Sequence, residues 1–277
     1  MQCELIRWML FQRKQIDAFE RRNQDGSVPT REEWLRHVLG GTLSFPHRNE
    51  TFYFVPEIGP DKAFIVGRVG RKIIVKENEP PQKGLKETAR DQWRAVDVII
   101  DPRTHADGQK IAVEINKRVG APPGLMQSLA DFINAMDPPH PYSIDSNTII
   151  DTDDFMGFVR EHKGEVVSVT FELVAPNMFG IRDDIDRELE ELKKNENVRK
   201  ARFTLQNEDG LRLDTERVAR TAEHAAEGGG SIRARTRRGA TFNSKKKGKK
   251  IFIYEEDIDG LAKLSVLSKI IDAVFKK

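Results

Sequence analysis

The chain has 277 residues, 38% of them hydrophobic and 32% charged, which is a composition typical of a globular protein with real hydrophobic cores. No stretch reaches the roughly 18 uninterrupted apolar residues of a membrane-spanning helix, and Glu4 and Arg7 interrupt any signal-peptide core, so we expect no membrane insertion. Cys3 is the only cysteine, which excludes internal disulfides and thiolate metal cages and favours the reducing cytoplasm.

The first half predicts an α+β arrangement. Residues 4–12 are apolar-rich and favour a strand, and Thr30 with Glu33 forms a capping-box pattern that predicts a helix over 31–39. A later helix is expected to begin at Pro122 and to end near Met136. Segments rich in β-branched and aromatic residues predict strands between these helices, at 51–55, 63–66, 73–75, 96–100 and 111–115.

Three prolines within residues 138–141 indicate a boundary, because proline fits neither a helix interior nor a central strand. The sequence therefore predicts two domains, 1–137 and 153–277, joined by a Pro-rich and acidic linker at 138–152. We expect each domain to be an α+β unit with a mainly antiparallel sheet and packed helices.

The second half alternates helical and strand patterns. Helices are predicted at 153–161, 181–194, 215–227 and 257–275. Strands are predicted at 165–174, 198–205, 231–235 and 251–254. The last helix carries a stripe of large aliphatic residues that must be covered either by the chain's own sheet or by a second copy: Ile258, Leu261, Leu264, Leu267, Ile270, Ile271 and Val274.

A run without acidic residues, 231–250, concentrates positive charge near the end of the chain. Its basic residues are Arg233, Arg235, Arg237, Arg238, Lys245, Lys246, Lys247, Lys249 and Lys250. Because phosphate neutralisation by Lys and Arg dominates non-specific nucleic-acid affinity, this run predicts DNA contact. Strand-like segments on both sides predict that the run forms a basic hairpin. Two other interpretations remain: a solvated loop, or a surface that docks on an acidic protein partner.

Enzymatic chemistry has weaker support. Asp97 or Asp101, followed by Glu114 and Lys117, is similar to the Asp…Glu-x-Lys pattern of magnesium-dependent restriction-type nucleases. In that pattern the lysine lies two residues after the glutamate, on the same strand face, and Asn116 occupies this position here. The sequence also lacks a P-loop, a dinucleotide-binding glycine motif and a nucleophile elbow, and its six histidines lack metal-ligand spacing. We therefore expect neither catalysis nor a cofactor.

The order of elements resembles that of a known family. The common features of the first half are an amino-terminal strand, a short helix, the hairpin of Phe52-Tyr53-Phe54 with Phe64-Ile65-Val66, and a helix that contains Leu125, Leu129, Asp131 and Phe132. Those of the second half are a charged helix at 182–194, a strand leading into Glu208-Asp209-Gly210, a basic region and a terminal helix ending in lysines. This layout resembles RexA, the phage-exclusion protein, and its homologues in temperate phages.

The resemblance implies a two-domain homodimer with a fold like that of the recombination-associated protein RdgC. It implies sequence-independent binding of double-stranded DNA, a part in antiviral defence by exclusion of competing phages, and no enzymatic activity. It supplies no binding residues. The DNA-contacting residues expected here follow from charge alone, with the arginines as forked donors and the lysines as mobile point charges.

Overall fold

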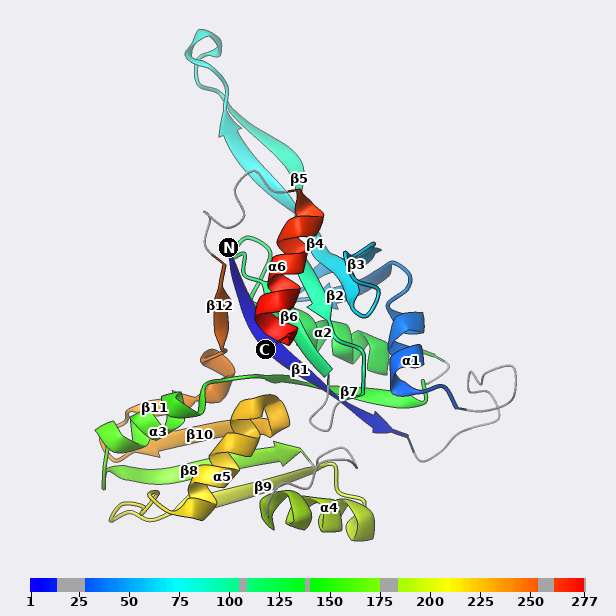
Figure 1. Cartoon of the computed structure of the whole chain (residues 1–277). Coiled ribbons are helices and arrows are strands. Elements are labelled where there is room, and N and C mark those ends of the chain that lie inside the picture. Colours follow the sequence, from blue (N-terminus) through cyan, green and yellow to red (C-terminus); the bar gives the residue numbers. More distant parts are fainter. Residues whose placement is uncertain (14–27, 105–108, 138–139, 175–183, 254–261, 277) are drawn as a thin grey trace.

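The computed structural model describes residues 1–13, 28–104, 109–137, 140–174, 184–253 and 262–276, without the side chains of 184–186. These residues form two antiparallel sheets with packed helices, which confirms the mixed α+β class (Figure 1). The first sheet runs in the order β12-β1-β6-β5-β4-β3-β2, with β7 also paired to β1, and the second in the order β11-β10-β8-β9.

The strands of the first sheet are β1 (Gln2–Gln12), β2 (Leu43–His47), β3 (Glu50–Glu57), β4 (Ile65–Asn78), β5 (Glu87–Ile100), β6 (Gln109–Glu114), β7 (Tyr142–Thr148) and β12 (Lys250–Phe252). Those of the second sheet are β8 (Val166–Val174), β9 (Lys200–Gln206), β10 (Gly230–Thr236) and β11 (Thr241–Asn243). The α-helices are α1 (Arg31–Val38), α2 (Pro122–Asn134), α3 (Thr152–Glu161), α4 (Asp184–Glu196), α5 (Glu216–His224) and α6 (Lys263–Phe275).

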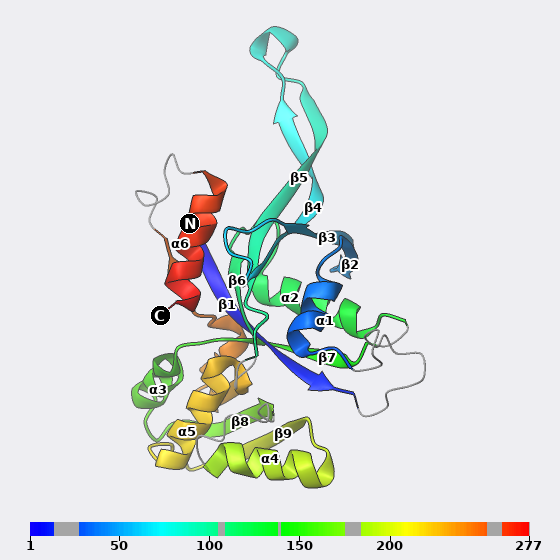
Figure 2. The same cartoon turned by 45° about the vertical axis from the view of Figure 1, so that its right-hand side comes forward.

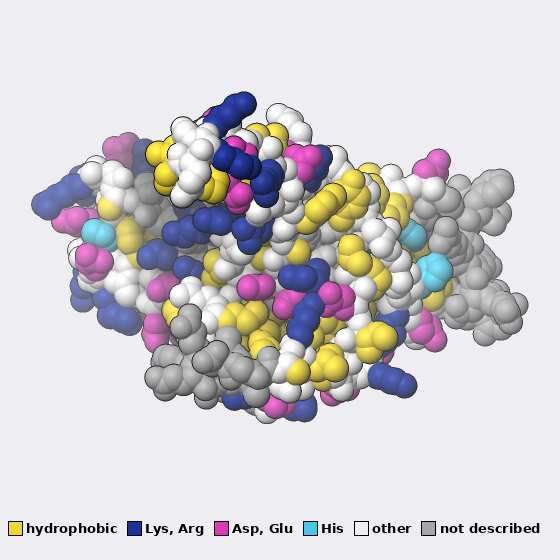
Figure 3. Space-filling view, turned by 90° about the horizontal axis from the view of Figure 1, so that it is seen from above, with side chains coloured by type: hydrophobic (Ala, Val, Ile, Leu, Met, Phe, Trp, Pro, Cys, Tyr) yellow, Lys and Arg dark blue, Asp and Glu magenta, His cyan; other side chains and the backbone are white. Residues whose placement is uncertain are grey.

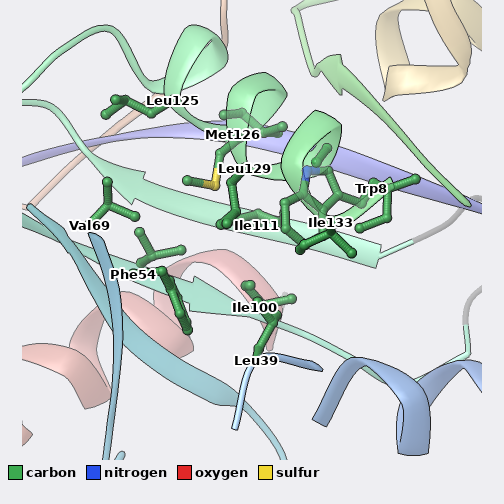
Figure 4. Close-up of a cluster of buried hydrophobic side chains, with 14 of the residues drawn as sticks. Trp8, Leu39, Phe54, Val69, Ile100, Ile111, Leu125, Met126, Leu129 and Ile133 are labelled. Atoms are coloured by element: carbon green, nitrogen blue, oxygen red, sulfur yellow. The ribbon is translucent and has the colours of Figure 1, made fainter. Parts of the chain in front are cut away.

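Helices cover both faces of the first sheet. On one face α1 and α2 bury a large apolar core, part of which is drawn in Figure 4 with Trp8 of β1 among side chains of α2. The capping box predicted for α1 is present, since the Thr30 hydroxyl accepts from the Glu33 amide and the Glu33 carboxylate accepts from the Thr30 amide. The opposite face packs against α6.

The chain's own sheet covers the apolar stripe of the terminal helix. Leu267, Ile270 and Ile271 of α6 are each 1% exposed and pack against Cys3 and Leu5 of β1. Leu264 is 51% exposed, while Ile258 and Leu261 lie outside the described residues. The sequence left open whether the chain's own sheet or a second copy covers the stripe. The structure shows that the buried residues of the stripe pack in the core of their own chain.

The described helices of the second half cover one face of the second sheet. Phe155 of α3, Leu189 of α4 and Val218 of α5 pack on the side chains that β8 and β10 turn inward. After α5 the chain makes a wide helical turn, Ala225–Gly229, before entering β10. The other face of this sheet has no helix over it in the described part of the chain (Figure 2).

Three predictions about the organisation of the chain were wrong. The expected linker contains β7, which pairs with β1 over seven positions from Ile6↔Thr148 to Gln12↔Tyr142, because residues 142–148 have few charges and bury well. The predicted strands 63–66 and 73–75 are not separate, because one long strand, β4, begins at Ile65 and continues through Gly67 and Gly70 to Asn78. The carboxyl-terminal half does not stay together, since β12 and α6 return to the first sheet.

Among the described helices, none combines the length and apolarity needed to cross a membrane.

Truncation of the α6 stripe tests its packing. We expect Leu267→Ala to lower the free energy of unfolding by about 2 to 5 kcal/mol, because it leaves a cavity under α6. The matched change Leu264→Ala, at a half-exposed position of the same helix, should cost less than about 0.5 kcal/mol. Urea unfolding measures both, and equal effects would contradict the packing.

Candidate nucleic-acid interface

The basic run is divided between the two sheets and does not form the single hairpin that was predicted. β10 pairs with β8 and with β11, and the short helical turn η3 (Ser244–Lys246) follows. β12 then pairs with the first residues of β1, with Cys3 opposite Ile251. The prediction was wrong because β10 pairs with the nearby β11 and with β8, while β12 pairs with β1, so β10 and β12 do not pair with each other. Tyr254 lies outside the described residues.

Arg233 and Arg235 lie on the open face of the second sheet. Ile232 and Ala234 alternate with them and are buried in the core under α3 and α5, so the strand period directs both guanidinium groups away from the helices. At about 3.3 Å per residue, the two Cα atoms are roughly 7 Å apart, which allows the two side chains to reach different phosphates.

A pocket joins Arg233 to Lys246, the last residue of η3, and to Lys247, which follows it. Its volume is about 300 Å³, and its lining residues are Arg233, Ala234, Thr241, Phe242, Asn243, Lys246 and Lys247. Three cations from two segments thus converge without an acidic side chain in the lining, and hydroxyl and amide groups lie between them. This is the donor set expected of a site for phosphate oxygens.

Local hydrogen bonds fix the position of η3. The Asn243 side chain accepts from the Lys245 amide at 3.1 Å, which caps the turn. The buried hydroxyl of Ser244 accepts from the Ile232 amide at 2.9 Å and ties the turn to β10. The lysines of η3 therefore extend from an ordered support and lose less freedom on binding an anion than those of a loose tail would.

The remaining basic residues of the run lie elsewhere. Arg237 and Arg238 are in the turn after β10, where Arg237 donates to the Glu208 carbonyl at 2.6 Å and Arg238 lies 3.5 Å from the Glu165 carboxylate. Lys249 is 3.8 Å from Asp151, and Lys250 on β12 lies opposite Glu4. These residues have protein partners, so we assign the interface to Arg233, Arg235, the η3 residues Lys245 and Lys246, and Lys247 directly after η3.

Charge alone did not identify the polar residues that surround this site. The open face also presents Ser168 and Thr170 of β8 next to Thr204 of β9, and the two threonine hydroxyls lie 3.1 Å apart. Lys200 and Arg202 of β9 are exposed on the same face, although both pair with Glu172. A sequence signal was present in the alternation of Ser and Thr with buried residues in β8.

The residues of the alternative nuclease site do not meet. Asp101 is buried beside Arg103, whose guanidinium is 2.6 Å from its carboxylate, and its amide bonds to Lys110. Glu114 lies opposite Asp97 on the neighbouring strand. Asp97 precedes Asp101 by four residues, so Glu114 is about 13 Å from Asp101. Lys117 is exposed in the turn after β6. Asp101, Glu114 and Lys117 therefore do not form one metal site.

Asp97 and Glu114 are neighbours, and the Asp97 amide donates to the Glu114 carboxylate at 3.1 Å. The Asp97 carboxylate also lies 3.1 Å from Arg68 and 3.5 Å from Lys263, an arrangement typical of a structural ion-pair network. The described residues contain no group of three or more His, Cys, Asp or Glu side chains arranged to hold a metal ion.

Comparison with protein-family models, with curated proteins and with solved structures found no match. The likeness to RexA therefore rests on the order of elements alone.

The partly buried carboxylate of Glu114 makes stability depend on pH. Burial, and secondarily the charge of Asp97, raises its pKa above the ordinary value of 4.5, so the folded state binds the proton more tightly than the unfolded state does. The free energy of unfolding should therefore fall as the pH rises from 4.5 through the folded-state pKa. We expect Glu114→Gln to reduce this fall, whereas Glu161→Gln at an exposed position should not, as measured by urea unfolding at several pH values.

Proposed function

We propose that this protein binds double-stranded DNA without sequence preference and without catalysis, through phosphate contacts made by the open face of the second sheet. The observation that carries the proposal is the convergence of Arg233, Lys246 and Lys247 on one pocket that has no acidic lining residue. A fixed cluster of cations with hydroxyl and amide donors between them suits a polyanion whose charges recur at regular spacing.

Duplex DNA fits this surface better than a single strand does. Single-strand binding proteins stack bases on exposed aromatic rings, and the aromatic ring of the basic run, Phe242, is 4% exposed and packs on Phe155 and Phe158. Apart from Val174 at the end of β8, which packs on β1, the outward positions of β8, β9, β10 and β11 are occupied by polar and charged residues instead. Such a surface contacts the backbone and does not read bases, which predicts equal affinity for unrelated sequences.

The biological setting belongs to the same proposal. The RexA-like order of elements supports a role in phage exclusion, a form of antiviral defence, and a DNA ligand supports a cytoplasmic location. An adaptor that docks on an acidic protein partner is the competing interpretation of the same cations. Salt dependence separates the two, because binding to the DNA backbone releases condensed counterions.

The triple variant Arg233→Ala, Lys246→Ala and Lys247→Ala tests the site. We expect it to weaken binding of unrelated duplexes to the same degree and to reduce the slope of log K against log salt by about one unit per lost contact, roughly three in total. Fluorescence anisotropy with duplexes of different sequence, from low to moderate salt, measures both effects.

The matched control removes the same charge elsewhere by replacing the exposed Lys62, Lys117 and Lys194 with alanine. It should leave the salt slope nearly unchanged. An equal loss in both variants would indicate a diffuse field without a site, and wild-type protein with no measurable duplex affinity at low salt would overturn the proposal.

A further inference from the structure

A two-stranded arm projects from the first sheet. β4 and β5 pair over their whole length, from Ile65↔Ile100 to Asn78↔Glu87. β3 accompanies β4 only as far as Arg71, and β6 accompanies β5 only from Val98 to Ile100. Residues 72–93, the arm, therefore extend beyond the body of the molecule, at the end away from the second sheet (Figures 1 and 2).

One face of the arm carries large apolar side chains in water. Ile74 is 71% exposed and Trp93 is 63% exposed. The register places Lys72 opposite Trp93 and Ile74 opposite Asp91, so all four side chains share this face. Tyr53 of β3 continues it, with its ring centroid 5.6 Å from that of Trp93, and Val55 follows at 43% exposure. An exposed Trp beside a partly exposed Tyr, at the centre of such a patch, is typical of protein interfaces.

The charge of the arm does not favour DNA as the occupant of this face. The arm has five basic residues against four acidic ones, which gives a net charge of +1. Cross-strand ion pairs join Lys72 to Asp91 at 2.5 Å and Lys76 to Glu87 at 2.8 Å. Viewed along the arm, the molecule shows hydrophobic side chains among basic and acidic ones (Figure 3). This differs from the acid-free pocket of the second sheet.

The same charges suit a second copy of the chain. On this face Lys72 pairs with Asp91 and Lys76 pairs with Glu87, so the face is neutral, and a twofold rotation places it against an identical face without an excess of like charge. An isolated two-stranded ribbon is at best marginally stable in water, so an arm of this length needs a partner surface for its exposed face.

We propose that the Trp93 face of the arm docks on the same face of a second copy, with the two arms antiparallel about a twofold axis. Trp93 then packs on the partner's Ile74, and Lys72 lies near the partner's Asp91. This interface is distinct from the α6 stripe, which the chain's own sheet covers, and the proposal does not depend on DNA binding.

The first test measures mass by light scattering at micromolar concentration. Wild-type protein should give twice the single-chain mass of 31.6 kDa. The double variant Ile74→Asp and Trp93→Arg should give the single-chain mass with an unchanged circular dichroism spectrum. The control Phe252→Asp, at a 57% exposed position of β12, should remain a dimer. A wild-type monomer, or a dimer that survives the double change, overturns the proposal.

The second test uses opposite single changes that leave Trp93 in place. Chains with Lys72→Asp carry two acids at positions 72 and 91, and chains with Asp91→Lys carry two bases there, so each should self-associate more weakly than wild type does. Mixed together they should form a heterodimer preferentially, because each acid then meets a base of the other chain. Native mass spectrometry distinguishes the species, and random mixing would contradict the antiparallel register.

A DNA-binding assay on the same samples distinguishes a failure of the arm contact from a failure of the proposed DNA-binding function. The monomeric arm variant should retain a salt-dependent duplex affinity, although a reduced one, while the Arg233, Lys246 and Lys247 variant should remain dimeric. A monomeric wild type that binds duplex DNA would refute the arm contact alone.

Discussion

The buried strand β1 is the constraint on which the rest of the structure depends. Every residue from Cys3 to Phe11 is buried, and the strand pairs with three others: β12 and β6 near its start, and β7 from Ile6 onward. Its side chains supply both cores of the first sheet, with Trp8 toward α2 and Leu5 toward α6. Because β1 carries apolar side chains on both faces, both faces must be shielded from water, and β1 therefore requires helices on each side of the sheet.

The same strand also positions the second sheet. Met9 and Phe11 form a small apolar cluster with Val174 at the end of β8. Gly228, in the turn before β10, packs so closely that a Cβ atom there would lie 2.7 Å from the Cβ of Arg7, and its φ of +89° also favours glycine. Near the other end of β1, a Cβ at Gly248 would lie 1.9 Å from the Glu4 carboxylate. The turn just before the basic run and the last residues of the run thus pack against β1.

The sequence predicted local structure better than it predicted which strands pair. The capping box of α1, the strands β1, β6 and β8, and the apolar stripe of α6 follow from patterns within a few residues, and the structure contains them. The pairing of β12 with β1 joins residues about as far apart as the chain allows, and no local pattern encodes it. β2 was missed because its sequence, Leu-Ser-Phe-Pro-His, contains a proline, which an edge strand tolerates.

For the site, charge predicted the segment but not the subset of residues. Arg233 and Arg237 are both arginines of one run, yet the strand period exposes the first on the open face and the turn places the second against Glu208. The hydroxyl groups of Ser168 and Thr170 carry no charge signal, and their relevance depends on β8 pairing with β10.

The two exposed surfaces differ in the physics that would drive their binding. The open face of the second sheet concentrates positive charge, so its interactions should weaken with salt. The arm is nearly neutral and apolar at its centre, so its contacts should persist in salt.

Because the arm projects away from the second sheet, arm-to-arm docking leaves that sheet's open face accessible (Figure 1). Two open faces in one assembly could then engage one duplex, and the second contact would form at a high effective concentration. Dimerisation through a salt-resistant surface would in this way strengthen duplex binding, which is weak and salt-sensitive in each single chain.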